Sequence, residues 1–127
     1  MNIHADSLWI GALIKNRIEG IVPVYPAIAP ADAPRDYCVY RRSGYSGRDT
    51  KDRFNYEETL FIEIAVVSPS YRDGIKIAQE IKDRLDGARG LWEGKMIEGI
   101  RMTNASEEFG DNAYIQRLFF SITVDIS

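Results

Sequence analysis

The sequence predicts an α+β fold, with two α-helices packed on one face of an antiparallel or mixed β-sheet in a single domain. Two segments, Glu58 to Val67 and Ile115 to Ile126, alternate apolar and polar residues, which indicates strands with one core face. Two other segments have apolar residues at helical spacing. The chain has 127 residues, 45% of them hydrophobic, so residues 1–127 are expected to form one domain with a sizeable core.

The first 36 residues are predicted to hold one helix and one short extended segment. Asp6 or Ser7 can cap a helix over residues 7–19, in which apolar residues follow a helical spacing. An extended segment over 21–25 leads into PAIAPADAP. The prolines of this region remove backbone donors, so we expect a loop lying over the surface.

Tyr37 to Arg42 is predicted to be a strand and Ser43 to Asn55 a polar loop, because this loop contains Gly44 and Gly47 among charged and hydroxyl residues. The long strand from Glu58 follows. Ser70 is the expected N-cap of the second helix, with Asp73 three residues on in a capping-box arrangement. A weaker strand is expected over 95–103 and the last strand over 115–126.

Charge is unevenly distributed along the chain. The net charge is −3, yet the segment from residue 41 to 53 is basic. This loop could contact phosphates, with Tyr45 stacking on a base, or it could be a solvated hairpin loop that keeps sheet edges soluble. Its cations are Arg41, Arg42, Arg48, Lys51 and Arg53.

The residues that catalysis at neutral pH requires are scarce. His4 is the single histidine and lies near the chain start, and Cys38 lies in a predicted strand where a buried, inert thiol is expected. The acidic pairs at 57–58 and 107–108 are adjacent, so in strands they point to opposite faces. We therefore expect no enzyme, no metal site and no cofactor. No signal peptide and no membrane span is expected either.

The outer face of the predicted sheet is too apolar for a face left in water. A partner surface, such as another copy of the chain, would cover it, and the alternative is the proline-rich loop of the same chain. Its apolar residues are Phe61, Ala65, Val67, Ile115 and Phe119.

The order of these segments resembles the small tail-completion and tail-terminator proteins of long-tailed bacteriophages, which join tail to head. The resemblance covers nearly the whole chain. It rests on the opening helix and then VYPAIAPADAPRDYCVYRR, YEETLFIEIAVVS, SYRDGIKIAQEIKDRLDGARG, KMIEGIRMT, NASEEFGDN and YIQRLFFSITVDI. None of these segments is a catalytic signature.

This resemblance implies a structural virion protein that assembles as a homo-hexameric ring at the head-proximal end of the tail. The ring would end tail-tube polymerisation and bind the head–tail connector at the neck, and DNA would pass through its lumen. The protein would be made in the host cytoplasm. The basic loop would then contact passing DNA or the tail-tube protein, and Tyr45, Phe61 and Phe119 would lie at the subunit interface.

Three alternatives remain at this point. A head-completion or neck connector protein would also form a ring, but we would expect more helix and less of the long strand pair. A small ligand-binding or enzymatic α+β domain would need a pocket lined with ionisable groups. A nucleic-acid-binding module would need a more basic body.

Overall fold

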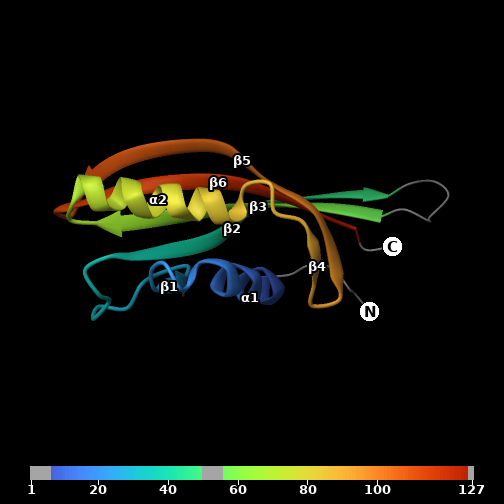
Figure 1. Ribbon diagram of the computed structural model, residues 1–127, viewed down its shortest axis with the longest axis horizontal. Helices are drawn as coiled ribbons and strands as arrows, with labels where there is room; N and C mark the ends of the chain where they lie inside the picture. The colour runs from blue at the N-terminus through green and yellow to red at the C-terminus, as the bar shows by residue number, and fades with distance from the viewer. Residues whose placement is uncertain (1–6, 50–55, 126–127) are drawn as a thin grey trace.

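The computed structural model describes residues 7–49 and 56–125, which contain two helices and six strands (Figure 1). A helix comes first, then three strands, a second helix and three more strands. The elements are α1 (Ser7–Ile18), β1 (Val24–Pro26), β2 (Tyr37–Asp49), β3 (Tyr56–Ser68), α2 (Tyr71–Leu85), β4 (Gly90–Trp92), β5 (Lys95–Gly110) and β6 (Ala113–Asp125).

The six strands form one sheet in the order β1-β2-β3-β6-β5-β4. β1 runs parallel to β2, and every other neighbouring pair is antiparallel. The two strands with the clearest alternation, β3 and β6, lie at the centre and pair from Glu57 opposite Asp125 to Ser68 opposite Tyr114. The β2–β3 and β5–β6 pairs extend the sheet on either side of this centre.

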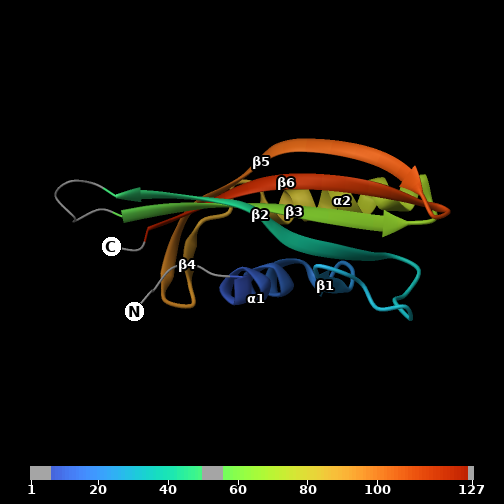
Figure 2. The same ribbon diagram turned by 180° about the vertical axis from the view of Figure 1, so that it is seen from behind.

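The sheet is curled into a half-barrel (Figures 1 and 2). The pairing register shifts between Arg42 and Gly44 in β2 and between Met102 and Asn104 in β5. Such irregularities bend a strand and increase its twist. The predicted architecture, a sheet layer with two helices on one face, is therefore wrong, because the strands dominate and form a mixed, curled six-stranded half-barrel. Alternation identifies the buried face of a strand but carries no information on curvature.

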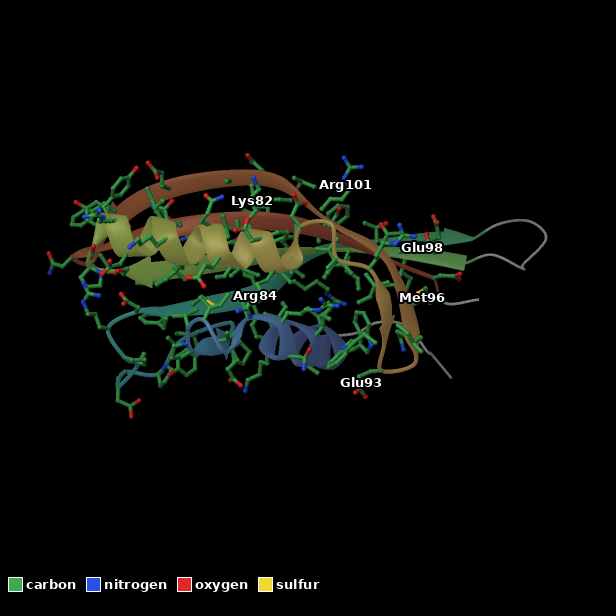
Figure 3. All side chains as sticks on the ribbon, in the orientation of Figure 1. Lys82, Arg84, Glu93, Met96, Glu98 and Arg101 are labelled. Atoms are coloured by element: carbon green, nitrogen blue, oxygen red, sulfur yellow. The ribbon has the colours of Figure 1, made fainter. Side chains whose placement is uncertain are left out.

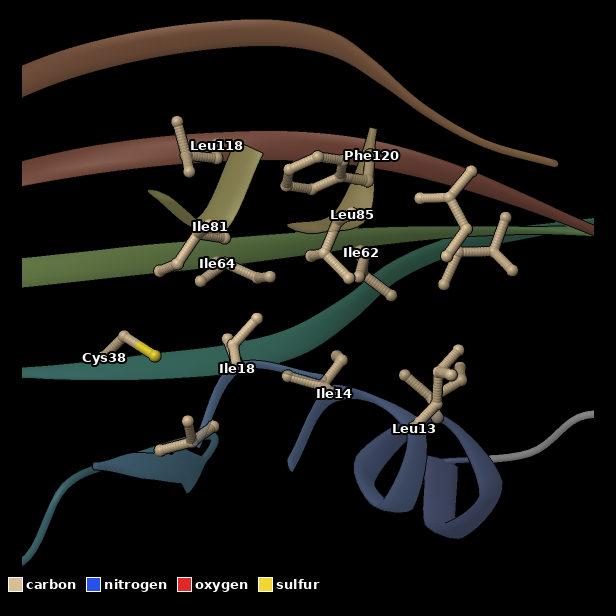
Figure 4. Packing of buried hydrophobic residues seen from close by; sticks show 14 of the residues in the cluster. Leu13, Ile14, Ile18, Cys38, Ile62, Ile64, Ile81, Leu85, Leu118 and Phe120 are labelled. Atoms are coloured by element: carbon tan, nitrogen blue, oxygen red, sulfur yellow. The ribbon is translucent and has the colours of Figure 1, made fainter. Parts of the chain in front are cut away.

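One hydrophobic cluster joins both helices to the buried face of the sheet (Figure 4). The helices contribute from two sides of the cluster, and the largest fully buried side chain is Phe120 of β6. Because residues of both helices belong to this one cluster, the described part of the chain shares a contiguous core. Its labelled members are Leu13, Ile14 and Ile18 of α1, Cys38 of β2, Ile62 and Ile64 of β3, Ile81 and Leu85 of α2, and Leu118 and Phe120 of β6.

The predicted start of the second helix is confirmed. The Ser70 side chain accepts a hydrogen bond from the backbone N–H of Asp73 at 3.2 Å, which satisfies one of the unpaired donors of the first turn. Ala78, Ile81 and Leu85 are buried on one side of the helix. This apolar side holds α2 against the central strands.

Two strands are longer than the sequence predicts. β2 continues to Asp49, so the part of the expected 43–55 loop that the structure describes is strand, with Ser46 opposite Thr59. β5 continues to Gly110, so the strand expected over 95–103 extends through most of the segment NASEEFGDN. In both cases pairing with a strongly β-forming neighbour overrides weak local propensity.

Two tight turns explain how the second half of the sheet is built. Asp111 and Asn112 have φ angles of 50° and 61° between β5 and β6, and Glu93 and Gly94 have φ angles of 47° and 80° between β4 and β5. Two consecutive positive φ angles are typical of the two-residue turns that match the twist of a hairpin. The second turn creates β4, a strand that the sequence analysis did not predict.

Candidate assembly surface

A chain of ion pairs crosses four strands on the outer face of the sheet, the face turned away from the helices. Arg41 of β2 donates from Nε and Nη2 to Oε1 of Glu63 on β3, at 3.2 and 2.9 Å. Arg117 of β6 donates from Nη1 to the other Glu63 oxygen, and from Nε to Oε1 of Glu108 on β5. We call Arg41, Glu63, Arg117 and Glu108 the ion-pair ladder.

Glu63 is the buried centre of this ladder. Its side chain is only 5% exposed, against 63% for Arg41. Burial raises the pKa of Glu63, but the hydrogen bonds from Arg41 and Arg117 outweigh this and hold the pKa below its ordinary value. Glu63 is therefore ionised at neutral pH, and the ladder as a whole carries no net charge.

A shallow groove of about 420 Å³ surrounds the ladder. Val39, Ala65 and Ile115 supply an apolar floor, and residues 27–29, part of the proline-rich segment PAIAPADAP, form one border. The backbone N–H of Ala27 donates to the carbonyl of Tyr40 at 2.9 Å, which holds this segment against the sheet. The segment thus borders the apolar face without closing it, and part of the face is open to a partner.

The two predicted interface phenylalanines lie on this same face. Phe61 is 37% exposed and Phe119 is half-buried, and Phe119 lies directly opposite Glu63 in the register. The structure therefore brings Phe61, Phe119 and Arg41 together around Glu63. Their role in a subunit interface stays a prediction.

The five predicted cations do not form one cluster in the part of the chain that the structure describes. Arg41 belongs to the ion-pair ladder, while Arg42 is exposed. Arg48 and Tyr45 lie within β2, where only the backbone is described, and Lys51 and Arg53 lie outside the described residues. Their contact with DNA or a tube protein stays a prediction.

Sequence reasoning missed the central residues of the ladder. Glu108 was considered only as a member of the acidic pair at 107–108, and Glu63 and Arg117 were not singled out. The signal is a charged residue at a position where the neighbours two residues away are apolar, Phe61 and Ala65. Its partners could be found only from the register between strands, which the sequence does not show.

Cys38 and the acidic pair Glu107 and Glu108 were the other candidate residues in the sequence. Cys38 is buried, as expected, and this burial raises the pKa of its thiol to about 12. Glu107 accepts a hydrogen bond from the Tyr71 hydroxyl at 3.0 Å, while its neighbour Glu108 joins the ladder. The two carboxylates therefore do not converge.

Within residues 7–49 and 56–125, no group of three or more potential ligands could hold a metal ion, and no helix is long and apolar enough to cross a membrane.

Comparison with known proteins gives a match in structure. No protein-family model matches the sequence, and no curated protein matches it. A solved structure described as the virion of a native gene transfer agent particle contains a chain of similar fold, with a TM-score of 0.63 and 18% identity. The match covers 97% of this chain and 88% of the other. At this identity the similarity shows a shared fold over essentially the whole domain.

Proposed function

We propose that this chain is a structural protein of a phage-like virion, and that it forms a ring at the head-proximal end of the tail. The observation that carries the proposal is the similarity in fold, over 97% of the chain, to a chain from a gene transfer agent virion. The resemblance of the sequence to tail-terminator proteins supports the same class. In this role the chain ends growth of the tail tube and joins the tail to the connector of the head.

The surface of the molecule supports an assembly role. The outer face carries an open groove with an apolar floor, and the exposed Phe61 lies on the same face. A ring needs two different surfaces on each copy, one for each neighbour. The long hairpin of β2 and β3, which reaches away from the body in Figure 1, is a second projecting surface.

A head-completion or neck protein is the second candidate. Such a protein is expected to contain more helix, whereas the described part of this chain is dominated by four long strands. The strand content therefore favours the tail-terminator role.

Tail tubes isolated from phage-like particles of the source strain provide the test. Purified chain carrying a small gold label is incubated with these tubes and imaged by electron microscopy. We expect label at one end of each tube. Label along the sides of the tubes, or tubes without label, would contradict the proposal.

The role of the basic loop can be tested separately. Replacing Arg48, Lys51 and Arg53 with Ser should leave the far-ultraviolet circular dichroism unchanged and reduce the joining of tails to heads. If tails assembled with this variant join heads as often as tails with the natural chain, the loop does not contact DNA or the tube.

A further inference from the structure

Two strand edges of the sheet lack a neighbouring strand among the described residues. β1 pairs with β2 only at Cys38 to Tyr40, so Arg42–Asp49, the β2 edge, has β3 alone beside it. β4 pairs with β5 only at Lys95 to Ile97, and Gly87 and Ala88 bond to Ile100. The following segment, Thr103–Gly110, is the β5 edge and has β6 alone beside it.

The β5 edge is open to a further strand. In an antiparallel strand, alternate residues turn their N–H and C=O groups away from the partner, so this edge presents a row of backbone groups without a neighbouring strand. Its residues from Thr103 to Phe109 are all exposed. The backbone N–H of Ala105 is one of these outward-facing groups. It donates to Oδ1 of the neighbouring Asn104 side chain at 2.8 Å.

A groove of about 240 Å³ lies beside this edge, between α2 and the sheet. Ile75 of α2 and Leu118 of β6 are among its apolar lining, and Lys82 lies on its helix side (Figure 3). Gln116, which also lines the groove, is 8% exposed, and its Nε2 has no hydrogen-bond partner in the described part of the molecule. Buried amide donors are normally satisfied, so this groove offers a donor to an acceptor on an incoming strand.

We propose that the β2 edge of a second copy adds as a strand to the β5 edge, with side chains on one side of the added strand entering the groove beside α2. This inference rests on the proposed ring and names the contact that builds it. The charges are complementary. Glu108 on the β5 edge is already paired with Arg117, but Glu107 on this edge contributes a carboxylate that accepts from the Tyr71 hydroxyl. The β2 edge contains Arg42 and Arg48 with one acid.

Strand direction places the opposite charges together. β2 and β5 run in opposite directions within one copy, because β3 and β6 alternate between them. A copy related by rotation about the ring axis presents β2 antiparallel to β5. The start of the β2 edge, with Arg42, then lies beside the end of the β5 edge, with Glu107 and Glu108.

The offset between the two edges fits a closed ring. Through the register, Tyr45 in the middle of the β2 edge corresponds to Ile122 of β6, whereas Ser106 in the middle of the β5 edge corresponds to Arg117. This is a displacement of about 17 Å along the strands, over four strands that span roughly 19 Å. The ratio of this displacement to this width corresponds to strands tilted by about 40° from the ring axis, which lies within the range of closed β-barrels.

Cross-linking between separately labelled copies tests this contact. Chains with Ser46→Cys and chains with Ser106→Cys, both on the outer face by the register, are mixed and treated with a short bismaleimide, in solution at high concentration and on tail tubes. The native Cys38 is fully buried and remains in both chains. We expect a covalent heterodimer by mass spectrometry. The matched control is Ser46→Cys mixed with Ser121→Cys on the outer face, which should give only a trace.

A charge exchange gives a second readout. Arg42→Glu and Glu107→Arg should each lower the yield of the cross-linked dimer by about tenfold, and mixing chains that carry the two changes should restore it. Glu80→Arg, on the exposed side of α2, is the control and should leave the yield unchanged. Restoration would be specific to this pair of edges.

The outcomes separate this inference from the proposed function. Absence of the Ser46–Ser106 heterodimer both in solution and on tubes, or cross-linking to Ser121 instead, would overturn the edge pairing. If the chain still binds tube ends, the virion role stands without this contact. A heterodimer formed by a chain that does not bind tubes would leave the edge pairing in place and remove the proposed function.

Discussion

Replacing Glu63 with Gln removes the charge at the centre of the ion-pair ladder and leaves its shape nearly unchanged. Hydrogen bonds to charged groups contribute about 1.5–3 kcal/mol each when they are buried. Arg41 is 63% exposed and regains water when its partner is lost, so this pair contributes no more than about 1 kcal/mol. Arg117 is 33% exposed and contributes more. We therefore expect a loss of about 2 kcal/mol in the free energy of unfolding at pH 7.

Urea unfolding followed by circular dichroism measures this loss, and a fall in Tm of roughly 5–10 °C should accompany it. Glu108→Gln is the matched control, because this carboxylate belongs to the same ladder but is 50% exposed. It should cost less than about 0.5 kcal/mol. If Glu63→Gln costs no more than the control, the ladder does not stabilise the sheet.

The same variant changes the response to acid. Because the pKa of Glu63 is lowered in the folded chain, its contribution is complete above the unfolded-state value of about 4.3 and is lost as the pH falls through the lower folded value. The natural chain should therefore lose stability over this interval, and the stability of Glu63→Gln should fall less steeply. Parallel acid titration curves for the two proteins would refute the assignment.

Three further predictions follow from burial and charge. Phe120→Ala should cost about 3–5 kcal/mol in urea unfolding, because the side chain is fully buried, whereas Phe109→Ala, 61% exposed, should cost less than about 1 kcal/mol; equal costs would contradict the core assignment. A hydrogen bond to Glu57 raises the pKa of Glu98, so the ionised form destabilises the folded chain. Glu98→Gln should therefore stabilise the folded chain by about 0.5 kcal/mol at pH 7. This gain should disappear as the pH falls to about 4.3, where the natural carboxyl is protonated as well. A stability difference between the two proteins that stays constant with pH would contradict the prediction. Cys38 should react with a thiol reagent only as fast as the chain unfolds, and rapid labelling of the native protein would show that the site is open.

The elements with strong local patterns could be predicted from the sequence. The alternation in β3 and β6 identified both central strands and their buried faces, and the Ser70 cap identified the start of α2. These features depend on residues that are near one another in the chain. Their physical causes, side-chain alternation and capping, are therefore visible in sequence.

Features set by distant residues could not be predicted. The extension of β2 through Gly44 and Gly47 depends on pairing with β3, and the length of β5 depends on β6. Curvature depends on register shifts, such as the one between Met102 and Asn104. In the candidate site, Phe61 and Phe119 followed from alternation, whereas the ladder around Glu63 joins side chains on four strands and exists only once the register is known.

Imaging the junction between head and tail in purified particles tests the central claim most directly. Cryo-electron microscopy of this region, with mass spectrometry of the same particles, should find the chain present and show a closed ring into which its curled six-stranded sheet fits. Particles that lack the chain, or a junction whose density is fully accounted for by other proteins, would contradict the account.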